Sequence, residues 1–465
     1  MSGLGTDENP LRVAVIGSGP SGFYAAEYLM KSAHKVLVDM YERLPAPFGL
    51  VRNGVAPDHQ KLKQPVLVYD KIAREPGFTY LGNVMVGKDV TVDELAAAYH
   101  AVIFANGAET DKKLWVPGED LPGSHTATEF VGWYNGHPDY RDRVFDLQQE
   151  VAVIIGQGNV AADVARILSK TVDELKNTDI AQHALDALAN SKVREIYAIG
   201  RRGPAQAKFT TKELREFGEL ADCDASVDPA ELVLNPESAA ELADKANFIQ
   251  AKNVAMFKQF AAVTPSKRKR CYFRFLAGPV ELIGNGRVEG VVLEKNALSG
   301  PANNQYARGT GEKCTLPCGI LFRSIGYNGI AMPGVPFDER KGVIPNTDGR
   351  IVDANKAIVP GLYVTGWIKR GPSGIIGTNR ADSVATCNSL LADLAQLDTG
   401  TPKAGAAAIY PLLNNRNVPL VNYDRWLKID AVEVDHGKVK GKPREKFTRV
   451  AEMLAIQVYP RNGKA

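Results

Sequence analysis

Two glycine-rich runs of similar design begin 139 residues apart in this 465-residue chain. The first is Gly17-Ser18-Gly19-Pro20-Ser21-Gly22, and the second is Gly156-Gln157-Gly158-Asn159-Val160-Ala161. Each follows a short apolar run rich in β-branched residues and precedes an apolar stretch of helical length, which predicts the order strand, turn, helix. Glycines in such a turn let a phosphate reach the backbone amides of the helix N-terminus, where larger side chains would obstruct it. The pattern predicts two dinucleotide-binding sites; the alternative at the first is a tight turn without a ligand.

The strand that follows each turn ends in a different kind of side chain. Glu42 lies 20 residues after Gly22, at the end of a strand expected over 36–41. A carboxylate there accepts hydrogen bonds from ribose hydroxyls. The strand expected over 195–199 ends instead in Gly200-Arg201-Arg202, and arginines at this position favour a ribose 2′-phosphate. The two ends therefore suggest FAD at the first site and NADPH at the second, unless the arginines only cap a strand at the surface.

Further elements must complete these two sites. The segment Ala105-Asn106-Gly107-Ala108 ends a strand over 101–104, as expected where two domains join. A buried strand over 361–365 precedes a turn over 366–374 and a helix over 377–394, whose positive N-terminal end would stabilise negative charge on a reduced flavin ring. Thr171 and Glu174 form a predicted capping box that begins extra helices over 171–190. We expect residues 222–260 to be mostly helical, residues 271–326 to form antiparallel strands, and the basic tail beyond 400 to be less patterned.

Composition excludes several classes of protein. Apolar residues make up 45% and charged residues 23% of the chain, which is typical of a globular protein and not of a disordered one. The formal net charge of +3 gives no reason to expect nucleic acid as a partner. Five cysteines without a C-x-x-C pair provide neither a disulfide framework nor a dithiol centre. No apolar run is long enough to span a bilayer, and the polar N-terminus lacks the pattern of a signal or transit peptide, so we expect a cytoplasmic protein.

Five longer segments carry a resemblance to a known family. They are Phe48-Gly49-Leu50-Val51-Arg52-Asn53-Gly54-Val55-Ala56-Pro57-Asp58-His59, the run 156–163, Arg201-Arg202-Gly203-Pro204, Phe209-Thr210-Thr211-Lys212-Glu213-Leu214-Arg215-Glu216 and Gly366-Trp367-Ile368-Lys369-Arg370-Gly371-Pro372. The chain resembles adrenodoxin reductase and its bacterial relatives, the NADPH–ferredoxin reductases of mycobacteria, from about residue 10 to about residue 455. The wider flavoenzyme group has Asp at the position of Trp367. Its replacement by Trp is the pattern of adrenodoxin reductase.

The resemblance implies an α/β fold with two Rossmann-like dinucleotide-binding domains of the glutathione-reductase type, without the redox disulfide. Residues 1–110 would form the first part of the FAD-binding domain, 111–328 the NADP-binding domain, and 329–465 the second part of the FAD-binding domain with a C-terminal extension. The implied enzyme is an FAD-dependent NADPH–ferredoxin reductase, in which a hydride passes from NADPH to FAD N5 and single electrons then pass to an acidic iron–sulfur ferredoxin. Two alternatives are an electron-input flavoprotein subunit of a larger redox enzyme, similar to the glutamate synthase small subunit, and a non-catalytic NADP-binding or sensor protein. The first alternative is weakened because that subunit carries N-terminal cysteine clusters, whereas the first cysteine here is Cys223.

The motifs and the resemblance together name the candidate cofactor-binding residues. Those expected at FAD are Gly17, Gly19, Pro20, Ser21, Gly22, Glu42, Arg43, Leu50, Val86, Ala105, Gly107, Gly366, Trp367, Gly374, Ile375 and Ile376. Those expected at NADP are Gly156, Gln157, Gly158, Asn159, Val160, Arg201, Arg202 and Glu213. By the resemblance, Trp367 and 374–376 line the isoalloxazine ring, and Trp367 also lies near the nicotinamide. No metal is expected.

Two further groups of residues have more than one interpretation. The resemblance places His59 and Glu216 together beside the flavin, where they would handle a proton or orient a group; alternatively they form a charged pair that holds a loop. Hydride transfer itself needs no protein acid or base. The basic run 267–270 is either a solvated loop or a dock for an acidic ferredoxin, and Lys369 and Arg370, next to Trp367, are the better-placed docking candidates.

Overall fold

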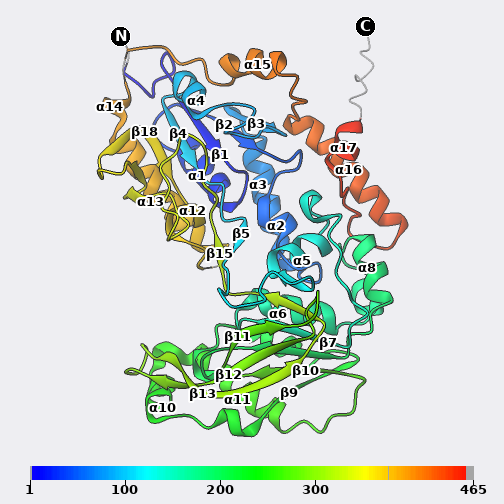
Figure 1. Cartoon of the computed structure of the whole chain (residues 1–465). Helices are drawn as coiled ribbons and strands as arrows, with labels where there is room; N and C mark the ends of the chain where they lie inside the picture. Colours follow the sequence, from blue (N-terminus) through cyan, green and yellow to red (C-terminus); the bar gives the residue numbers. More distant parts are fainter. Residues whose placement is uncertain (1–2, 375, 399, 457–465) are drawn as a thin grey trace. The chain divides into compact units, whose positions relative to one another are not determined.

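The computed structural model describes residues 3–374, 376–398 and 400–456, which divide into two compact units (Figure 1). Unit 1 consists of the described residues of 1–55, 59–110 and 327–465, and unit 2 of 56–58 and 111–326. The chain passes between the units at two short strands, β5 (Thr110–Asp111) and β15 (Tyr327–Asn328). The short segment 56–58 belongs to unit 2 because Asp58 forms ion pairs with Arg166 and Lys170 there.

Unit 1 is built on one seven-stranded sheet. Its strands are β1 (Leu11–Ile16), β2 (Val36–Glu42), β3 (Phe78–Gly82), β4 (Ala101–Phe104), β16 (Asn346–Thr347), β17 (Arg350–Val352) and β18 (Ile358–Val364). They lie in the order β16-β17-β18-β4-β1-β2-β3. The five strands from β18 to β3 are parallel, and β16 and β17 pair antiparallel. A parallel sheet with this crossover order is the arrangement predicted for a dinucleotide-binding domain.

Apolar clusters cover both faces of this sheet. Along β1, Val13 and Val15 belong to one cluster, and Ala14 and Ile16 belong to the other. This explains why the strand reads as a continuous apolar run and does not alternate, as expected for a parallel sheet buried on both sides. The helical segments of unit 1 are α1 (Pro20–Met30), α2 (Gly49–Asn53), η1 (Gln60–Lys63), α3 (Pro65–Ala73), α4 (Val92–Ala98), α12 (Trp367–Arg370), α13 (Thr378–Ala392), α14 (Leu394–Leu397), α15 (Ala406–Asn415), α16 (Tyr423–Val439) and α17 (Val450–Ala455).

Unit 2 contains a six-stranded parallel sheet. Its strands are β6 (Ser124–Thr126), β7 (Val151–Ile155), β8 (Glu195–Ile199), β9 (Cys223–Val227), β10 (Lys269–Arg274) and β14 (Ile320–Arg323). Their order is β6-β14-β7-β8-β10-β9. Strands β7 and β8 coincide with the two strands expected around the second glycine turn, and β7 pairs in parallel with both β8 and β14. The second glycine turn therefore leaves a central strand of the sheet, as the first does in unit 1.

Unit 2 also contains helical segments, and a second sheet is inserted in the chain between β10 and β14 of the first. The segments are α5 (Ala127–Tyr134), η2 (Pro138–Tyr140), α6 (Asn159–Ser169), α7 (Val172–Leu175), α8 (Gln182–Ala189), η3 (Pro204–Gln206), α9 (Thr211–Glu216), η4 (Pro229–Leu232), α10 (Pro236–Ala243), η5 (Lys245–Asn247) and α11 (Phe248–Ala261). The inserted sheet is antiparallel and consists of β11 (Ala277–Ile283), β12 (Gly290–Ser299) and β13 (Tyr306–Pro317). The predicted capping box is confirmed, since Thr171 and Glu174 cap α7 reciprocally.

Several local expectations need correction. Residues 223–227 form strand β9 and not helix, because Cys223, Ala225 and Val227 alternate with polar residues at the period of a strand. The antiparallel expectation holds for β11–β13 only, since β10 and β14 join the parallel sheet. The turn over 366–374 contains the short helix α12, and the tail beyond 400 contains the long helix α16. None of the helices in the described ranges has both the length and the apolar character needed to cross a bilayer.

Candidate functional site

The first glycine turn connects β1 to α1 in unit 1, and its three glycines differ in what surrounds them. Gly17 has a φ of 105°, and a Cβ atom there would lie 2.6 Å from the carbonyl oxygen of Ala105. A Cβ atom on Gly22 would lie 2.1 Å from the carbonyl oxygen of Gly17. At Gly19, in contrast, a Cβ atom would meet no atom of the described residues within 4 Å, its own chain neighbours aside. Close packing explains why the first and third positions are glycine. The second position is not packed in this way, and glycine there leaves space beside the turn.

Helix α1 directs its N-terminus at this open space. Gly19 is the N-cap of the helix, no side chain caps it, and a proline stands in the first turn. The first backbone N–H groups of a helix have no intrahelical acceptor, and the helix dipole adds positive potential there. Uncapped amides next to an open glycine are the arrangement that a pyrophosphate needs. The residues of the first turn therefore fit the dinucleotide predicted for them.

Glu42, at the end of β2, lies directly beside the turn. Its Oε2 atom accepts hydrogen bonds from Ser18 N at 3.2 Å and from Ser18 Oγ at 2.6 Å, and its Oε1 atom accepts one from Leu44 N at 3.1 Å. These bonds fix the carboxylate next to the glycines, where the prediction requires it for a ribose. The neighbouring Arg43 forms an ion pair with Glu109 at 3.1 Å.

The second turn, between β7 and α6 in unit 2, repeats this design. Gly156 has a φ of 145°, and its Cβ atom would lie 2.1 Å from the carbonyl oxygen of Ser324. Gly158 is the uncapped N-cap of α6, and nothing lies within 4 Å of a Cβ atom there. Gln157 donates to the carbonyl oxygen of Arg274 at 2.7 Å, and Asn159 accepts from the backbone N–H of Thr210 at 2.8 Å. The side chains that follow the two glycines thus brace the turn against its neighbours.

Arg201 and Arg202 follow β8 and supply uncommitted positive charge. Across the described part of the chain, neither guanidinium has a hydrogen bond or an ion pair, and Arg201 is exposed. Their backbone is well held: the carbonyl oxygen of Arg201 accepts from Asn296 Nδ2 at 2.9 Å, and that of Arg202 accepts from Leu276 N at 3.0 Å. Two free guanidiniums on a braced turn are suited to bind a phosphate dianion.

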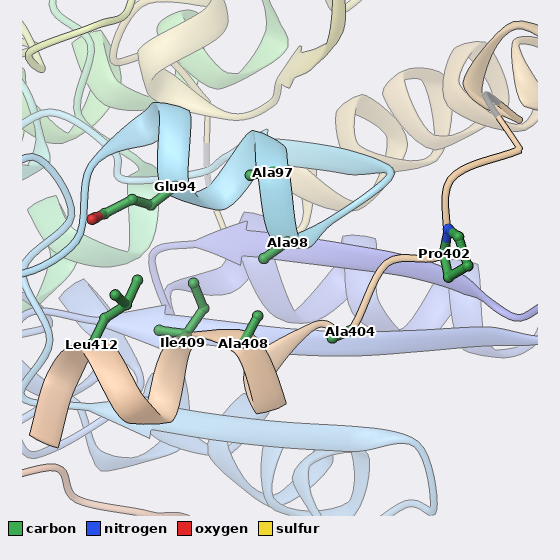
Figure 2. Close-up of a pocket in the computed structure, with 8 residues that line it drawn as sticks. All are labelled: Glu94, Ala97, Ala98, Pro402, Ala404, Ala408, Ile409 and Leu412. Atoms are coloured by element: carbon green, nitrogen blue, oxygen red, sulfur yellow. The ribbon is translucent and has the colours of Figure 1, made fainter.

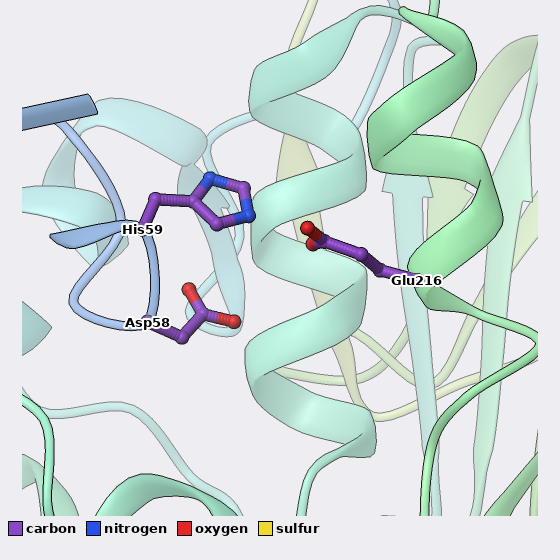
Figure 3. A group of neighbouring side chains, drawn as sticks. All are labelled: Asp58, His59 and Glu216. Atoms are coloured by element: carbon purple, nitrogen blue, oxygen red, sulfur yellow. The ribbon is translucent and has the colours of Figure 1, made fainter. Parts of the chain in front are cut away.

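Arg166, which the sequence analysis did not single out, organises a buried charge cluster in unit 2. This α6 side chain is 0% exposed, and its guanidinium contacts four carboxylates. They are Asp58 at 2.8 Å, Asp163 at 2.7 Å, Glu213 at 2.8 Å and Glu216 at 3.4 Å. Figure 3 draws Asp58 and Glu216 of this cluster. The cluster fixes both Glu213 and Glu216, the predicted NADP-binding and catalytic candidates of helix α9.

The cluster also determines the protonation of Asp58. Burial alone would raise the pKa of this carboxyl group, but the hydrogen bonds and charges of Arg166 and Lys170 outweigh it and hold the pKa well below its ordinary value. Asp58 therefore stays ionised at any physiological pH. His59, the next residue along the chain, is buried in unit 1. A charged residue inside the apolar face of a helix, as Arg166 is in α6, is the sequence signal that would have indicated the cluster.

The remaining candidates lie in unit 1, and one of them adjoins the first turn. A Cβ atom on Gly366, whose φ is 78°, would lie 2.2 Å from Ser21 Oγ, so these two candidates adjoin. Trp367 stacks on Tyr327 with ring centroids 5.5 Å apart and donates from Nε1 to the carbonyl oxygen of Ser373. Leu50 is 40% exposed although it is apolar. The other members are the buried Val86 and Ala105, the left-handed Gly107 and Gly374, and the partly buried Ile376. Ile375 lies outside the described residues.

The basic residues suggested as a ferredoxin dock are largely committed to other contacts within the protein, which weakens that expectation. Lys369 Nζ lies 2.8 Å from Asp382, which Arg370 also contacts at 3.4 Å. In the run 267–270, Lys269 is buried and donates to the carbonyl oxygen of Leu168 at 2.8 Å. Its neighbour Arg268 pairs with Asp222. Most of this positive charge is neutralised or buried, so neither group is a free basic surface.

A separate hollow lies between α4 and α15 in unit 1 (Figure 2). Its volume is about 380 Å³, and alanines and aliphatic side chains make up most of its lining. The lining residues are Glu94, Ala97, Ala98, Pro402, Ala404, Ala408, Ile409 and Leu412. None of them is a predicted site residue, so this hollow is distinct from the glycine turns.

Two sheets with parallel central strands, each with an open glycine turn at a helix N-terminus, are the arrangement of a protein that binds two dinucleotides, and comparison with known proteins identifies the class as an oxidoreductase. The family described as pyridine nucleotide-disulphide oxidoreductase matches residues 11–199. The chain is 45% identical to the mitochondrial NADPH:adrenodoxin oxidoreductase of Salvelinus fontinalis, over 96% of this chain and 91% of that protein. It is also 45% identical to the NADPH-ferredoxin reductase FprA of Mycobacterium leprae, over 96% of this chain and 98% of that protein.

A solved structure agrees with these relatives. The structure of Mycobacterium tuberculosis FprA in complex with NADPH matches with a TM-score of 0.91 and 43% identity, covering 96% of this chain and 99% of that one. The chain belongs to the family of NADPH:adrenodoxin oxidoreductases and NADPH–ferredoxin reductases. The predicted family, the α/β fold class and the assignment as an oxidoreductase are thereby confirmed.

Proposed function

We propose that this protein is an FAD-dependent NADPH–ferredoxin reductase of the adrenodoxin reductase type. The observation that carries the proposal concerns the charge beside each of the two open glycine turns. The strand that follows the first turn ends in an acidic side chain, and the strand that follows the second ends in basic side chains. The first turn has a carboxylate, Glu42, that accepts a hydrogen bond from Ser18 N of the turn. The second has two guanidiniums, Arg201 and Arg202, that form no hydrogen bond or ion pair with the described residues. A carboxylate suits an unmodified ribose and repels a 2′-phosphate, whereas guanidiniums favour that phosphate. The relatives named as NADPH-dependent reductases of adrenodoxin or ferredoxin support the same assignment.

In this proposal unit 1 binds FAD and unit 2 binds NADP(H). The domain ranges predicted from the sequence assign the cofactors in the same way: FAD to 1–110 with 329–465, and NADP to 111–328. The uncapped amides of α1 and α6 would each receive a pyrophosphate at the open position beside Gly19 and Gly158. Bound FAD would supply the two-electron to one-electron conversion, because it accepts a hydride from NADPH and can release electrons singly to an iron–sulfur protein.

The protein's own side chains would bind and orient the two dinucleotides. Glu42 would accept hydrogen bonds from the FAD ribose, and Arg201 with Arg202 would clamp the 2′-phosphate of NADP. Trp367, braced by its stacking on Tyr327 and its bond to Ser373, would limit the space beside the flavin ring. We assign His59 and Glu216 a proton-handling or orienting role. Arg166 supports this for Glu216, because it keeps the carboxylate in place.

Two measurements test the proposal. The purified protein should be yellow, with the absorption bands of oxidised flavin, and NADPH under anaerobic conditions should bleach them. It should then reduce at least one ferredoxin from a panel of the host's own ferredoxins, with NADPH as the donor. A protein that purifies without flavin and does not bind added FAD would contradict the proposal. We place the enzyme in the cytoplasm, whose reducing conditions suit its four buried thiols and the exposed Cys314.

A further inference from the structure

A buried ion pair joins helix α16, near the C-terminus, to helix α2 in unit 1. The Arg52 guanidinium donates to both carboxylate oxygens of Glu433, at 2.8 Å and 2.5 Å. The two side chains are only 5% and 0% exposed. Arg52 also lies over the ring of Trp426, 5.0 Å from its centroid. A bidentate pair of this kind, with a cation–π contact in a dry environment, holds its two elements in one relative position.

The chain after α16 strengthens this junction. Lys446 is 4% exposed and donates from Nζ to the carbonyl oxygen of Arg52 at 3.0 Å. The backbone N–H of the next residue, Phe447, donates to Glu433 Oε1 at 3.0 Å. Residues more than 380 positions apart in the sequence are thus joined through both the side chain and the backbone of Arg52.

The segment that receives these contacts lies against the first glycine turn. Phe48 adopts a left-handed conformation with a φ of 86° and donates its backbone N–H to the carbonyl oxygen of Ser18 at 3.0 Å. A Cβ atom on Gly49 would lie 3.0 Å from the Cα atom of Gly19, so the segment approaches the turn at its open glycine. Trp426 also contacts the Phe48 ring edge-on, at 5.9 Å between centroids. The C-terminal segment therefore holds Phe48–Leu50 through two sets of contacts: Trp426 packs on Phe48, and Glu433 and Lys446 bond to Arg52.

We propose that the Arg52–Glu433 pair and Lys446 are positioning residues for FAD: they hold Phe48–Leu50 against the first glycine turn and so determine how tightly the cofactor is retained. The inference rests on the proposed function, since it assigns FAD to the first turn. None of the three charged groups needs to touch the cofactor. They act by keeping the left-handed Phe48 and the close approach at Gly49 in place, a conformation that an isolated chain adopts rarely.

Lys446→Met provides the test, with Lys442→Met as the matched control. Both lysines are buried, at 4% and 5% exposure, and lie four residues apart, but Lys442 donates to Glu445 within the same segment at 2.7 Å. The purified holoenzymes are diluted, and released FAD is followed by the rise of its fluorescence. We expect Lys446→Met to raise the dissociation constant for FAD about tenfold, the effect of one hydrogen bond from a charged donor. Lys442→Met should leave it within about twofold.

A second variant separates positioning from loss of folding. Arg52→Lys keeps the positive charge but loses the bidentate geometry, and should also release FAD faster. Binding of 2′,5′-ADP, a ligand for the arginines of unit 2, is measured for each variant and should remain at the wild-type level. Equal FAD release from Lys446→Met and Lys442→Met, or no change in Lys446→Met and Arg52→Lys, would overturn the proposal. A wild-type protein that never binds FAD would instead overturn the proposed function.

Discussion

A Cβ atom on Gly156 would lie 2.1 Å from the carbonyl oxygen of Ser324, the residue that follows the neighbouring strand β14. Gly158, two residues later in the same turn, has no atom within 4 Å of its own Cβ position. The first glycine is thus required by the fold, because backbone fills the space beside it. Among the described residues no neighbour requires the second glycine, and the pyrophosphate of the proposed NADP would explain it.

Substitution of these two glycines by alanine should therefore have different effects. Gly158→Ala should change the free energy of unfolding by no more than about 1 kcal/mol, the usual range for an N-cap position. It should weaken NADPH binding at least about tenfold, since a methyl group would occupy the ligand's space. Gly156→Ala should destabilise unit 2 itself, because it combines a φ of 145° with a backbone clash. Thermal unfolding and NADPH titration measure both, and an equal loss of stability in the two variants would contradict the assignment.

The preference for NADPH over NADH should reside in Arg201 and Arg202. Replacing both by alanine removes two charge-assisted contacts, so KM for NADPH should rise about 10²–10⁴-fold while KM for NADH changes little. Arg194→Ala is the matched control, since this exposed arginine precedes the same strand β8 at its other end. If KM for the two nucleotides rises together, the guanidiniums do not read the 2′-phosphate.

Asn296 should act on the same preference through the backbone. It donates to the carbonyl oxygen of Arg201, so Asn296→Ala should loosen the arginine turn without removing its charge. We expect KM for NADPH to rise about three- to tenfold, the loss associated with one neutral hydrogen bond, with kcat unchanged. Steady-state kinetics with both nucleotides give the result. A fall in kcat with KM unaltered would place Asn296 outside nucleotide recognition.

Asp58 should make a pH-dependent contribution to stability. Its pKa is depressed in the folded protein, so the stabilisation is present above the ordinary carboxyl pKa of about 4 and is lost as the pH falls below that value. Asp58→Asn should therefore lower the free energy of unfolding by about 2 kcal/mol at pH 7, and the difference from wild type should shrink below about pH 4. Urea titrations at pH 7, 5 and 3.5 follow this trend. A difference that stays constant across these values would show that Arg166 does not depend on the charge of Asp58.

Charge reversal at Lys369 should damage the flavin site before it affects docking. Asp382 bonds Lys369 with one oxygen and accepts the backbone N–H of Gly366 with the other, at 2.6 Å. Lys369→Glu would place two carboxylates together beside the turn that precedes Trp367. NADPH-dependent reduction of ferricyanide and of ferredoxin should therefore fall by a similar factor. A fall confined to ferredoxin would restore Lys369 as a docking residue.

Local sequence patterns were sufficient for the elements that carry the glycine turns. The predicted ranges 151–155 and 195–199 are β7 and β8, because short β-branched runs ended by glycine have few other interpretations. Long-range pairs could not be predicted in this way. Nothing in the sequence near Arg52 indicates its partner Glu433, 381 residues away. The basic run around Lys269 is typical of a solvated loop, but Lys269 is buried and donates to the carbonyl oxygen of Leu168. A charged residue is buried only where the fold supplies a partner for it, and a single sequence does not show which distant residue that partner is.

The pairing of β4 with β18 has a consequence for how the protein is made. The two strands are neighbours in the sheet of unit 1, but about 250 residues separate them in the chain, and nearly all of unit 2 lies between. During synthesis the ribosome completes unit 2 while β4 still has an unpaired edge. An open edge of this kind is a template for pairing with other chains. The nascent first segment should therefore depend on chaperones, or on delayed folding, until residue 364 has left the exit tunnel, whereas unit 2 can fold co-translationally.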